Sequence, residues 1–165
     1  MGMIAKFVVL QDTKLNELKA HPMTVAKFFS EQVRANSADA VLDIDKSWQG
    51  IHFLLTGEPF GGKEPNSLAI LGGVEIGEDL GYGPARYLDS AKVRLAAAAL
   101  AGISTADLRK RYIPADLEAA AIYPTGIWKK EAEGAFEYLV PWYKSLQAFY
   151  GQAAKRGDAM LLAVL

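Results

Sequence analysis

The sequence contains no cysteine, and this absence removes several kinds of chemistry. Disulfide bonds, thiolate nucleophiles and cysteine-ligated zinc sites are all excluded. Histidine is also scarce, since His21 and His52 are the two present and they form no helical pair. We therefore predict no metal site of the histidine or cysteine kind, although a site built from carboxylates alone stays open. A chain without disulfides fits a reducing compartment, and we expect it in the cytoplasm.

An excess of charge of either sign is missing as well. The chain has 18 basic and 19 acidic residues, which gives a formal net charge of −1. Binding to a nucleic acid requires a clear surplus of basic side chains to neutralise phosphates, so we expect no nucleic-acid partner.

Long hydrophobic runs are absent too. No apolar run reaches the roughly 18 residues that a membrane-spanning helix requires. The apolar segment Met3–Leu10 is short, is interrupted by Lys6 and has no small-residue cleavage site after it, so it does not resemble a signal peptide. We expect a soluble protein with no membrane partner.

The bulk composition is that of a folded protein. Hydrophobic residues make up 51% and charged residues 22% of the 165 positions, and mean hydropathy is +0.07. A chain of this length buries roughly 70% of the surface that it exposes when unfolded, so it needs no disulfide or metal to fold. We predict a single domain over residues 1–165.

Apolar segments at the two ends of the chain read as strands. Met3–Leu10 is rich in β-branched and aromatic residues, and Ala159–Leu165 is apolar throughout. A wholly apolar strand favours a position with neighbours on both sides. We predict an α+β fold in which these two strands pair within a mixed central sheet packed with several helices.

The region between the terminal strands is predominantly helical by pattern. Further strands are predicted at 67–74 and 86–88, with a glycine-rich connection over 75–84. Asp12, Asp89 or Ser90, and Ser104 are predicted helix caps. The predicted helices cover 13–20, 22–34, 90–100, a segment after Ser104, a short segment from Pro114, and 129–155, where Pro141 predicts a kink or two abutting helices.

The segment Leu42–Gly57 is the most informative part of the sequence. Ile44, Trp48, Ile51 and Leu55 recur at intervals of four, three and four residues, which predicts a helix with one apolar face. Gly57 is well suited to end that helix. The segment resembles the corresponding part of the YfbM-like proteins, a small bacterial family of unknown function. The resemblance continues through Leu71-Gly72, residues 85–100, Leu108-Arg109, Ile122-Tyr-Pro124 and the final helix and strand. It implies a small intracellular α+β domain, with no established catalytic residues or cofactor.

Polar residues on the same predicted helix are the candidates for catalysis. Asp45, His52 and Thr56 share one helical face, and Lys46 lies beside Asp45. In a catalytic interpretation, His52 is an acid–base group and Trp48, one turn before it, is a stacking wall. In a structural interpretation, both are packed in the core. Asp45 and His52 are about 10 Å apart along the helix axis, too far for a direct hydrogen bond.

Glycine-rich segments elsewhere in the chain do not indicate a nucleotide site by themselves. Residues 57–63 (GEPFGGK) match most of a phosphate-binding loop, but Glu64 replaces the hydroxyl residue that would bind magnesium. The segment also follows a predicted helix where such a loop follows a strand. Arg86 and Tyr87, which come after a second glycine-rich stretch, are candidates to extend a binding site around Trp48.

Two functions are compatible with these features. The first is a binding or protein-interaction module, favoured by the near-neutral charge and the lack of a recognisable catalytic motif. The alternative is an enzyme acting on a nucleotide or nucleotide-linked small molecule, with its site around Trp48 and His52. The partner, whether a protein or a small molecule, and any cofactor are not identified by the sequence.

Overall fold

The computed structural model describes residues 2–165, and its centre is a five-stranded sheet. The order across the sheet is β2-β1-β5-β4-β3. The strands are β1 (Ala5–Leu10), β2 (Val41–Asp43), β3 (Val74–Asp79), β4 (Pro84–Leu88) and β5 (Ala159–Val164). As predicted, the first and last strands pair, and the apolar β5 has neighbours on both sides. The α+β class is therefore confirmed.

The direction of the strands differs from the prediction. All four strand pairs are antiparallel, so the sheet is not mixed. Within residues 2–165, only β3 and β4 are joined by a short turn, which requires antiparallel pairing. The other neighbouring strands are separated by helical segments, and a sequence pattern does not indicate in which direction the chain returns.

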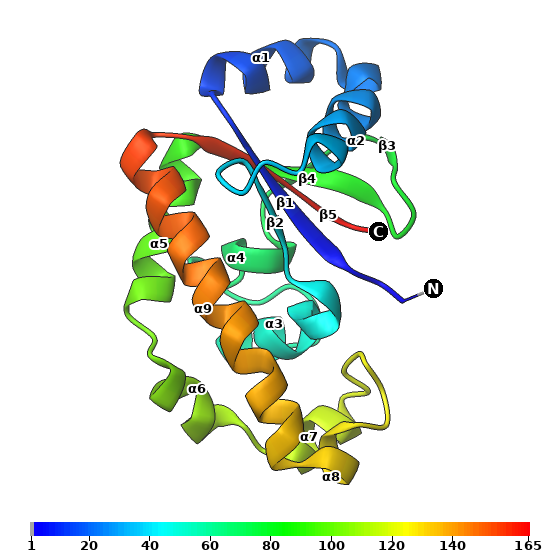
Figure 1. The fold of residues 1–165 in the computed structure, drawn as a ribbon, viewed down its shortest axis with the longest axis vertical. Coiled ribbons are helices and arrows are strands. Elements are labelled where there is room, and N and C mark those ends of the chain that lie inside the picture. The colour runs from blue at the N-terminus through cyan, green and yellow to red at the C-terminus, as the bar shows by residue number, and fades with distance from the viewer. Residues whose placement is uncertain (1) are drawn as a thin grey trace.

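Helices cover both faces of this sheet (Figure 1). One face carries α1 (Asp12–Ala20), the 3-10 turn η1 (Pro22–Thr24) and α2 (Val25–Ala35). The other face carries η2 (Asp45–Ser47), α3 (Trp48–Thr56), α4 (Leu68–Leu71), α5 (Ser90–Ala101), α6 (Thr105–Arg111), α7 (Pro114–Ala119), α8 (Trp128–Glu131) and α9 (Glu133–Arg156).

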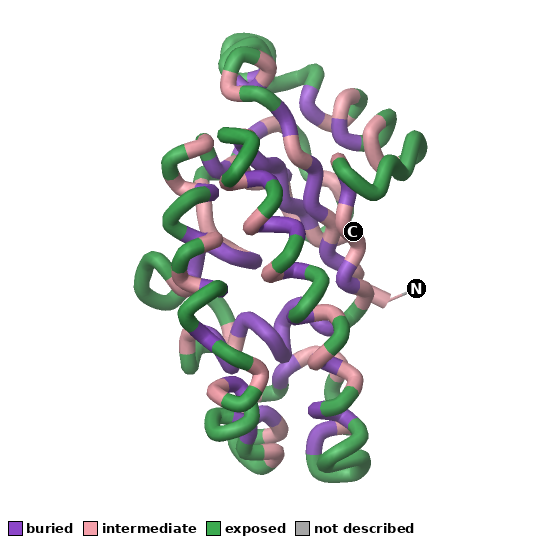
Figure 2. Tube along the Cα trace, turned by 60° about the vertical axis from the view of Figure 1, so that its left-hand side comes forward, coloured by how far each residue is buried: buried purple, intermediate pink, exposed green. Residues whose placement is uncertain are grey.

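Alternation along the strands produces two hydrophobic cores. On neighbouring strands, Phe7 and Leu162 point into the larger core with α3, α5 and α9. Val8 and Leu161 point into the smaller core with α1 and α2. Figure 2 shows the buried residues along the strands and on the inward sides of the helices, with the outward sides exposed. None of the helices in residues 2–165 combines the length and apolar character that a membrane crossing requires.

Two predicted segments after residue 66 were wrong. The predicted strand 67–74 contains the short helix α4, and the predicted connection 75–84 contains the strand β3. A four-residue apolar run such as Leu68–Leu71 fits either a helix or a strand. Strand β3 is an edge strand with one buried side chain, Ile76, so it lacks the hydrophobic signal of a central strand.

The helix predicted within Leu42–Gly57 is shorter than expected. Leu42 and Asp43 belong to β2, and α3 begins at Trp48 after the turn η2. The apolar stripe is confirmed, because Ile44, Trp48, Ile51 and Leu55 are all buried. Gly57 ends α3 with a φ angle of +79°, the left-handed conformation that favours glycine at this position.

Of the other predicted helix caps, those at Ser104 and Asp89 are confirmed and the one at Asp12 is wrong. Ser104 and Asp107 form the expected capping box, and Asp89 caps α5. Asp12 does not cap α1: its carboxylate accepts hydrogen bonds from the backbone and hydroxyl of Ser90 instead. The long C-terminal element is divided at Ala132, and Pro141 lies inside α9 on its exposed side.

Candidate functional site

Trp48 stands at the first turn of α3 and forms part of the wall of a cavity. Its indole N–H donates a hydrogen bond to the carbonyl of Met3 at 3.2 Å. One face of the ring stacks on Tyr123, with ring centres 6.1 Å apart. The residue is 3% exposed. Trp48 is therefore held in place and offers little surface to a ligand.

The cavity beside Trp48 has a volume of about 530 Å³. We call it the Trp48 pocket. It lies where the β3–β4 hairpin, the start of α3 and the loop after α3 meet, next to the ends of β1 and β5. Its lining residues are Met3, Trp48, Gln49, Phe60, Gly61, Leu71, Glu75, Tyr82, Gly83, Pro84, Arg86 and Val164.

The charged groups of the pocket come from one cross-strand pair. Glu75 on β3 and Arg86 on β4 face each other directly in the register of the hairpin. Nη2 of Arg86 donates to Oε1 of Glu75 at 2.7 Å, and Nη1 donates to the carbonyl of Gly73 at 3.2 Å. Both side chains are partly exposed. Arg86 is therefore oriented within the pocket wall before any ligand is bound.

Gln49, the other polar side chain of the wall, has a structural role. Its Oε1 accepts a hydrogen bond from the backbone N–H of Tyr123 at 2.8 Å. Its Nε2 donates to the carbonyl of Pro59 at 3.1 Å. Gln49 thus connects the loop after α3 and the segment around Tyr123 to the helix, and each of its polar atoms has one protein partner.

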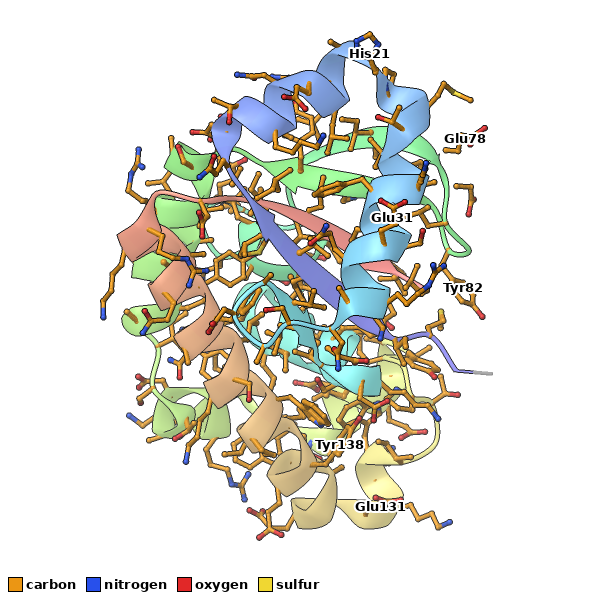
Figure 3. The ribbon with its side chains drawn as sticks, turned by 45° about the horizontal axis from the view of Figure 1, so that its top comes forward. His21, Glu31, Glu78, Tyr82, Glu131 and Tyr138 are labelled. Carbon is orange, nitrogen blue, oxygen red and sulfur yellow. The ribbon has the colours of Figure 1, made fainter. Side chains whose placement is uncertain are left out.

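Two aromatic side chains at the pocket are exposed. Phe60, in the loop after α3, is 68% exposed, and Tyr82, in the turn of the β3–β4 hairpin, is 56% exposed. Figure 3 shows Tyr82 at the outer end of the hairpin. Unlike Trp48, these two rings have free faces. They belong to separate loops, and both are followed by glycine in the sequence.

His52 is fully buried within α3 and lies outside the lining of the pocket. Within residues 2–165, neither ring nitrogen has a hydrogen-bond partner. Burial lowers the pKa of His52 to about 4, and the nearby backbone of Gly61 opposes that shift. At neutral pH the imidazole is therefore uncharged. Because Gly61 also lines the pocket, the loop after α3 separates His52 from the cavity.

The remaining catalytic candidates on the Leu42–Gly57 segment are not gathered around His52. The Asp45 carboxylate accepts a hydrogen bond from the hydroxyl of Tyr138 at 2.7 Å. The Thr56 hydroxyl donates to the carbonyl of His52 at 2.8 Å and accepts from the N–H of Glu58 at 3.1 Å. Lys46 is exposed. These contacts fix the ends of the helix and do not create an acid–base pair.

Arg86 and Tyr87 were predicted as binding residues together, but they lie on opposite faces of the sheet. Arg86 pairs with Leu162, whose side chain is in the larger core, and Tyr87 pairs with Leu161, whose side chain is in the smaller core. Successive side chains of a strand alternate in this way. The Lys19 ammonium lies 5.1 Å from the centre of the Tyr87 ring. The structure thus places Trp48 and Arg86 in one pocket and Tyr87 outside it.

Of the pocket residues with aromatic or charged side chains, sequence reasoning missed three, namely Phe60, Glu75 and Tyr82. A usable signal existed for the two aromatics, because large rings beside glycines in predicted loops are seldom needed for a core. Glu75 carried no signal while β3 was predicted as a connection.

Among the residues that the structure describes, no group of three or more histidine, aspartate or glutamate side chains could hold a metal ion.

Comparison with known proteins agrees with the fold and the sequence resemblance. The structure is similar to that of YfbM from Escherichia coli, a protein of unknown function, at 24% identity. The alignment covers 98% of this chain and 99% of that chain, with a TM-score of 0.76, and it shows a shared fold. None of the curated proteins matches the chain. The model of the family described as "Domain of unknown function (DUF1877)" matches residues 1–163. The YfbM-like resemblance is thereby confirmed, and the chain belongs to the DUF1877 family.

Proposed function

We propose that the protein is a binding module that holds a small molecule in the Trp48 pocket. The observation that carries this proposal is the pocket itself: a cavity of about 530 Å³ with aromatic and apolar walls and one charged pair. Ligand sites in proteins are typically cavities of about 300–1,000 Å³ that combine apolar walls with a few oriented polar groups. Arg86 meets that requirement, because Glu75 and the Gly73 carbonyl hold its guanidinium in place.

Binding without turnover is favoured by the state of the titratable groups. The catalytic candidates of the Leu42–Gly57 segment, Asp45, Lys46, His52 and Thr56, do not line the pocket, and the one carboxylate that does, Glu75, is paired with Arg86. The Asp45 carboxylate is bonded to Tyr138, and His52 lies behind the loop that contains Gly61. A general acid or base must come within hydrogen-bond reach of the proton that it transfers.

An enzyme acting on a nucleotide or nucleotide-linked molecule is the second candidate. One observation favours it: Gly61 both lines the pocket and lies beside the His52 ring. Displacement of this loop would bring His52 to the pocket. The discriminating measurement is an NMR time course of any bound compound, with wild type and His52→Leu compared. Chemical conversion by wild type alone would establish this second candidate in place of the first.

The binding function is tested by a thermal-shift screen of compound classes, with variants that probe the pocket. A ligand at about 100 times its Kd stabilises the folded state by roughly 2.7 kcal/mol, worth about 5–10 °C at this chain length. The double variant Phe60→Ala/Tyr82→Ala removes the two exposed rings of the pocket with little expected cost to folding. The matched control is Met23→Ala/Ile113→Ala, which removes exposed side chains outside the pocket (68% and 50% exposed).

We expect a shift in wild type and in the control that is lost in the Phe60→Ala/Tyr82→Ala variant. A shift that survives in that variant would place the binding site elsewhere. If no class of compound stabilises wild type, the small-molecule proposal fails. The exposed rings at the pocket would then be better explained as contacts for a protein partner.

A further inference from the structure

The polar groups of the Trp48 pocket are concentrated at one place. Glu75 and Arg86 are neighbours across the β3–β4 pair, and the amide of Gln49 is already bonded to Tyr123 and Pro59. Only Oε1 of Glu75 accepts from Arg86, and Oε2 has no protein partner within residues 2–165. Nη2 of Arg86 carries a second hydrogen that this bond does not use. The pair therefore presents an acceptor and a donor side by side.

The rest of the wall available to a ligand is aromatic or apolar. Phe60 and Tyr82 have exposed rings, and the Trp48 edge, Leu71, Pro84 and Val164 complete the surface. Exposed aromatic faces on loops are well suited to stack against a flat ring, because every heteroaromatic ring has a π-face. A ligand that fits this wall is a planar ring with apolar faces and polar groups along one edge.

Other ligand classes fit less well. A sugar has hydroxyl groups around its whole ring and needs polar partners on several sides, whereas the charged groups of this pocket are confined to the Glu75–Arg86 pair. A cation would meet the positive Arg86, and an anion would meet Glu75, so neither charge is favoured by the pair as a whole. A neutral ring with an adjacent donor and acceptor satisfies both groups at once.

We propose that the Trp48 pocket binds a nucleobase, with the ring stacked on Phe60 or Tyr82 and its hydrogen-bonding edge on Glu75 and Arg86, an assignment that rests on the binding function proposed above. Each of the four common bases offers a neighbouring donor and acceptor on its pairing edge. The chain's net charge of −1 favours a free nucleoside or nucleotide over a nucleic-acid strand, which would require many basic side chains.

Isothermal titration calorimetry of the whole protein would test this assignment. The probes are adenosine, guanosine, cytidine and uridine, with their 5′-monophosphates, and ribose 5-phosphate as a compound without a base. We expect at least one nucleoside to bind and ribose 5-phosphate to give no heat. Comparison of nucleoside with monophosphate shows whether the phosphate adds affinity. Adenosine and N6,N6-dimethyladenosine, or guanosine and N1-methylguanosine, test the pairing edge, because methylation removes the donor next to the acceptor, N6–H beside N1 in adenosine and N1–H beside O6 in guanosine.

Variants then locate the contacts. Glu75→Gln should raise the Kd of the nucleoside by about tenfold or more, because hydrogen bonds to a charged acceptor are stronger than those to a neutral one. The control is Glu78→Gln, on the same strand and outside the pocket lining (Figure 3). Loss of an exposed ion pair has little effect on folding, and unchanged Tm values for both variants would establish this.

The outcomes separate this assignment from the broader binding function. Absence of heat with all four nucleosides and their monophosphates overturns the assignment. Equal affinity for methylated and unmethylated bases, or equal affinity of Glu75→Gln and wild type, also overturns it. If the thermal-shift screen then finds another class of compound that depends on Phe60 and Tyr82, the binding function stands without the nucleobase. If it finds none, both fail.

Discussion

The hydroxyl of Tyr138 on α9 donates a 2.7 Å hydrogen bond to Oδ2 of Asp45 on η2, two residues that are 93 positions apart in the chain. Burial, and then the hydrogen bond to Asp45 and its negative charge, raise the pKa of Tyr138 well above its usual range, so the phenol keeps its proton. Asp45 itself has a φ angle of +51°, in the left-handed region. Figure 3 shows Tyr138 extending from α9. The bond joins the long C-terminal helix to the turn that precedes α3.

Substitutions of Asp45 should separate the contribution of its hydrogen bond to stability from the contribution of its backbone conformation. Asp45→Ala and Asp45→Gly both lose the bond to Tyr138, but only alanine carries a Cβ that disfavours a positive φ. We expect Asp45→Ala to lower the free energy of unfolding by about 1 kcal/mol more than Asp45→Gly. Tyr138→Phe, which removes only the bond, should cost about 1–2 kcal/mol. Urea denaturation of the three variants checks this order, and equal losses for alanine and glycine would contradict it.

His52 should make the protein less stable in acid. In the unfolded chain its imidazole protonates near the ordinary pKa of 6.5, whereas the folded protein lowers that pKa to about 4. Between these values the unfolded state binds more protons, so the free energy of unfolding falls as the pH falls from about 6.5 to about 4. The full loss is about 3 kcal/mol, at 1.36 kcal/mol per pKa unit. The contribution is intact above pH 6.5.

The measurement compares wild type and His52→Leu by urea denaturation at several pH values between 8 and 5. Leucine replaces an unpartnered buried polar group and does not titrate. We expect the free energy of unfolding of the variant, relative to that of wild type, to rise by about 2 kcal/mol as the pH falls from 8 to 5. His21→Leu, a substitution of the exposed histidine, is the control. Parallel pH profiles for wild type and His52→Leu would contradict the assignment.

Two glycines in helices should respond to alanine in opposite directions. A Cβ on Gly50 would lie 2.7 Å from the ring of Trp128 and 3.1 Å from a methyl group of Leu139, and both side chains are fully buried. We expect Gly50→Ala to lower the free energy of unfolding by about 1–3 kcal/mol. Gly151, in α9, has open space around it, so Gly151→Ala should raise the free energy by roughly 0.5–1 kcal/mol. Thermal unfolding of the two variants measures both effects, and stabilisation by Gly50→Ala would show that α3 and α9 pack less closely than described.

Hydrophobic pattern predicted the parts of the fold in which burial is strong. Strands β1 and β5 and the apolar stripe of α3 lie in the interior, and their sequences carry a clear hydrophobic signal. Strand β3 was not predicted for the opposite reason, since it lies at the sheet edge and contains glycine and acidic residues. Its strand conformation comes from pairing with β4, a tertiary contact that its own composition does not indicate.

The candidate site could be predicted only in part, because the pocket is assembled from separate loops. Trp48 and Arg86 were chosen as binding residues from different segments, and the structure places both in the wall of one cavity. The pattern on the helix also selected His52, which lies one turn after Trp48 in α3. Its exclusion from the pocket depends on the path of the loop through Gly61, which periodicity cannot describe.

The place of β5 between β1 and β4 has a consequence for how the chain folds. This strand is the last in sequence, yet it supplies the contact between one side of the sheet, β2 and β1, and the other, β4 and β3. Until residues 159–164 are available, a chain emerging from the ribosome can form only two unconnected antiparallel pairs. The pairing of Ala5 with Val164 closes a loop of nearly the whole chain. Contacts between residues so far apart in sequence slow folding, so the sheet is completed late in folding.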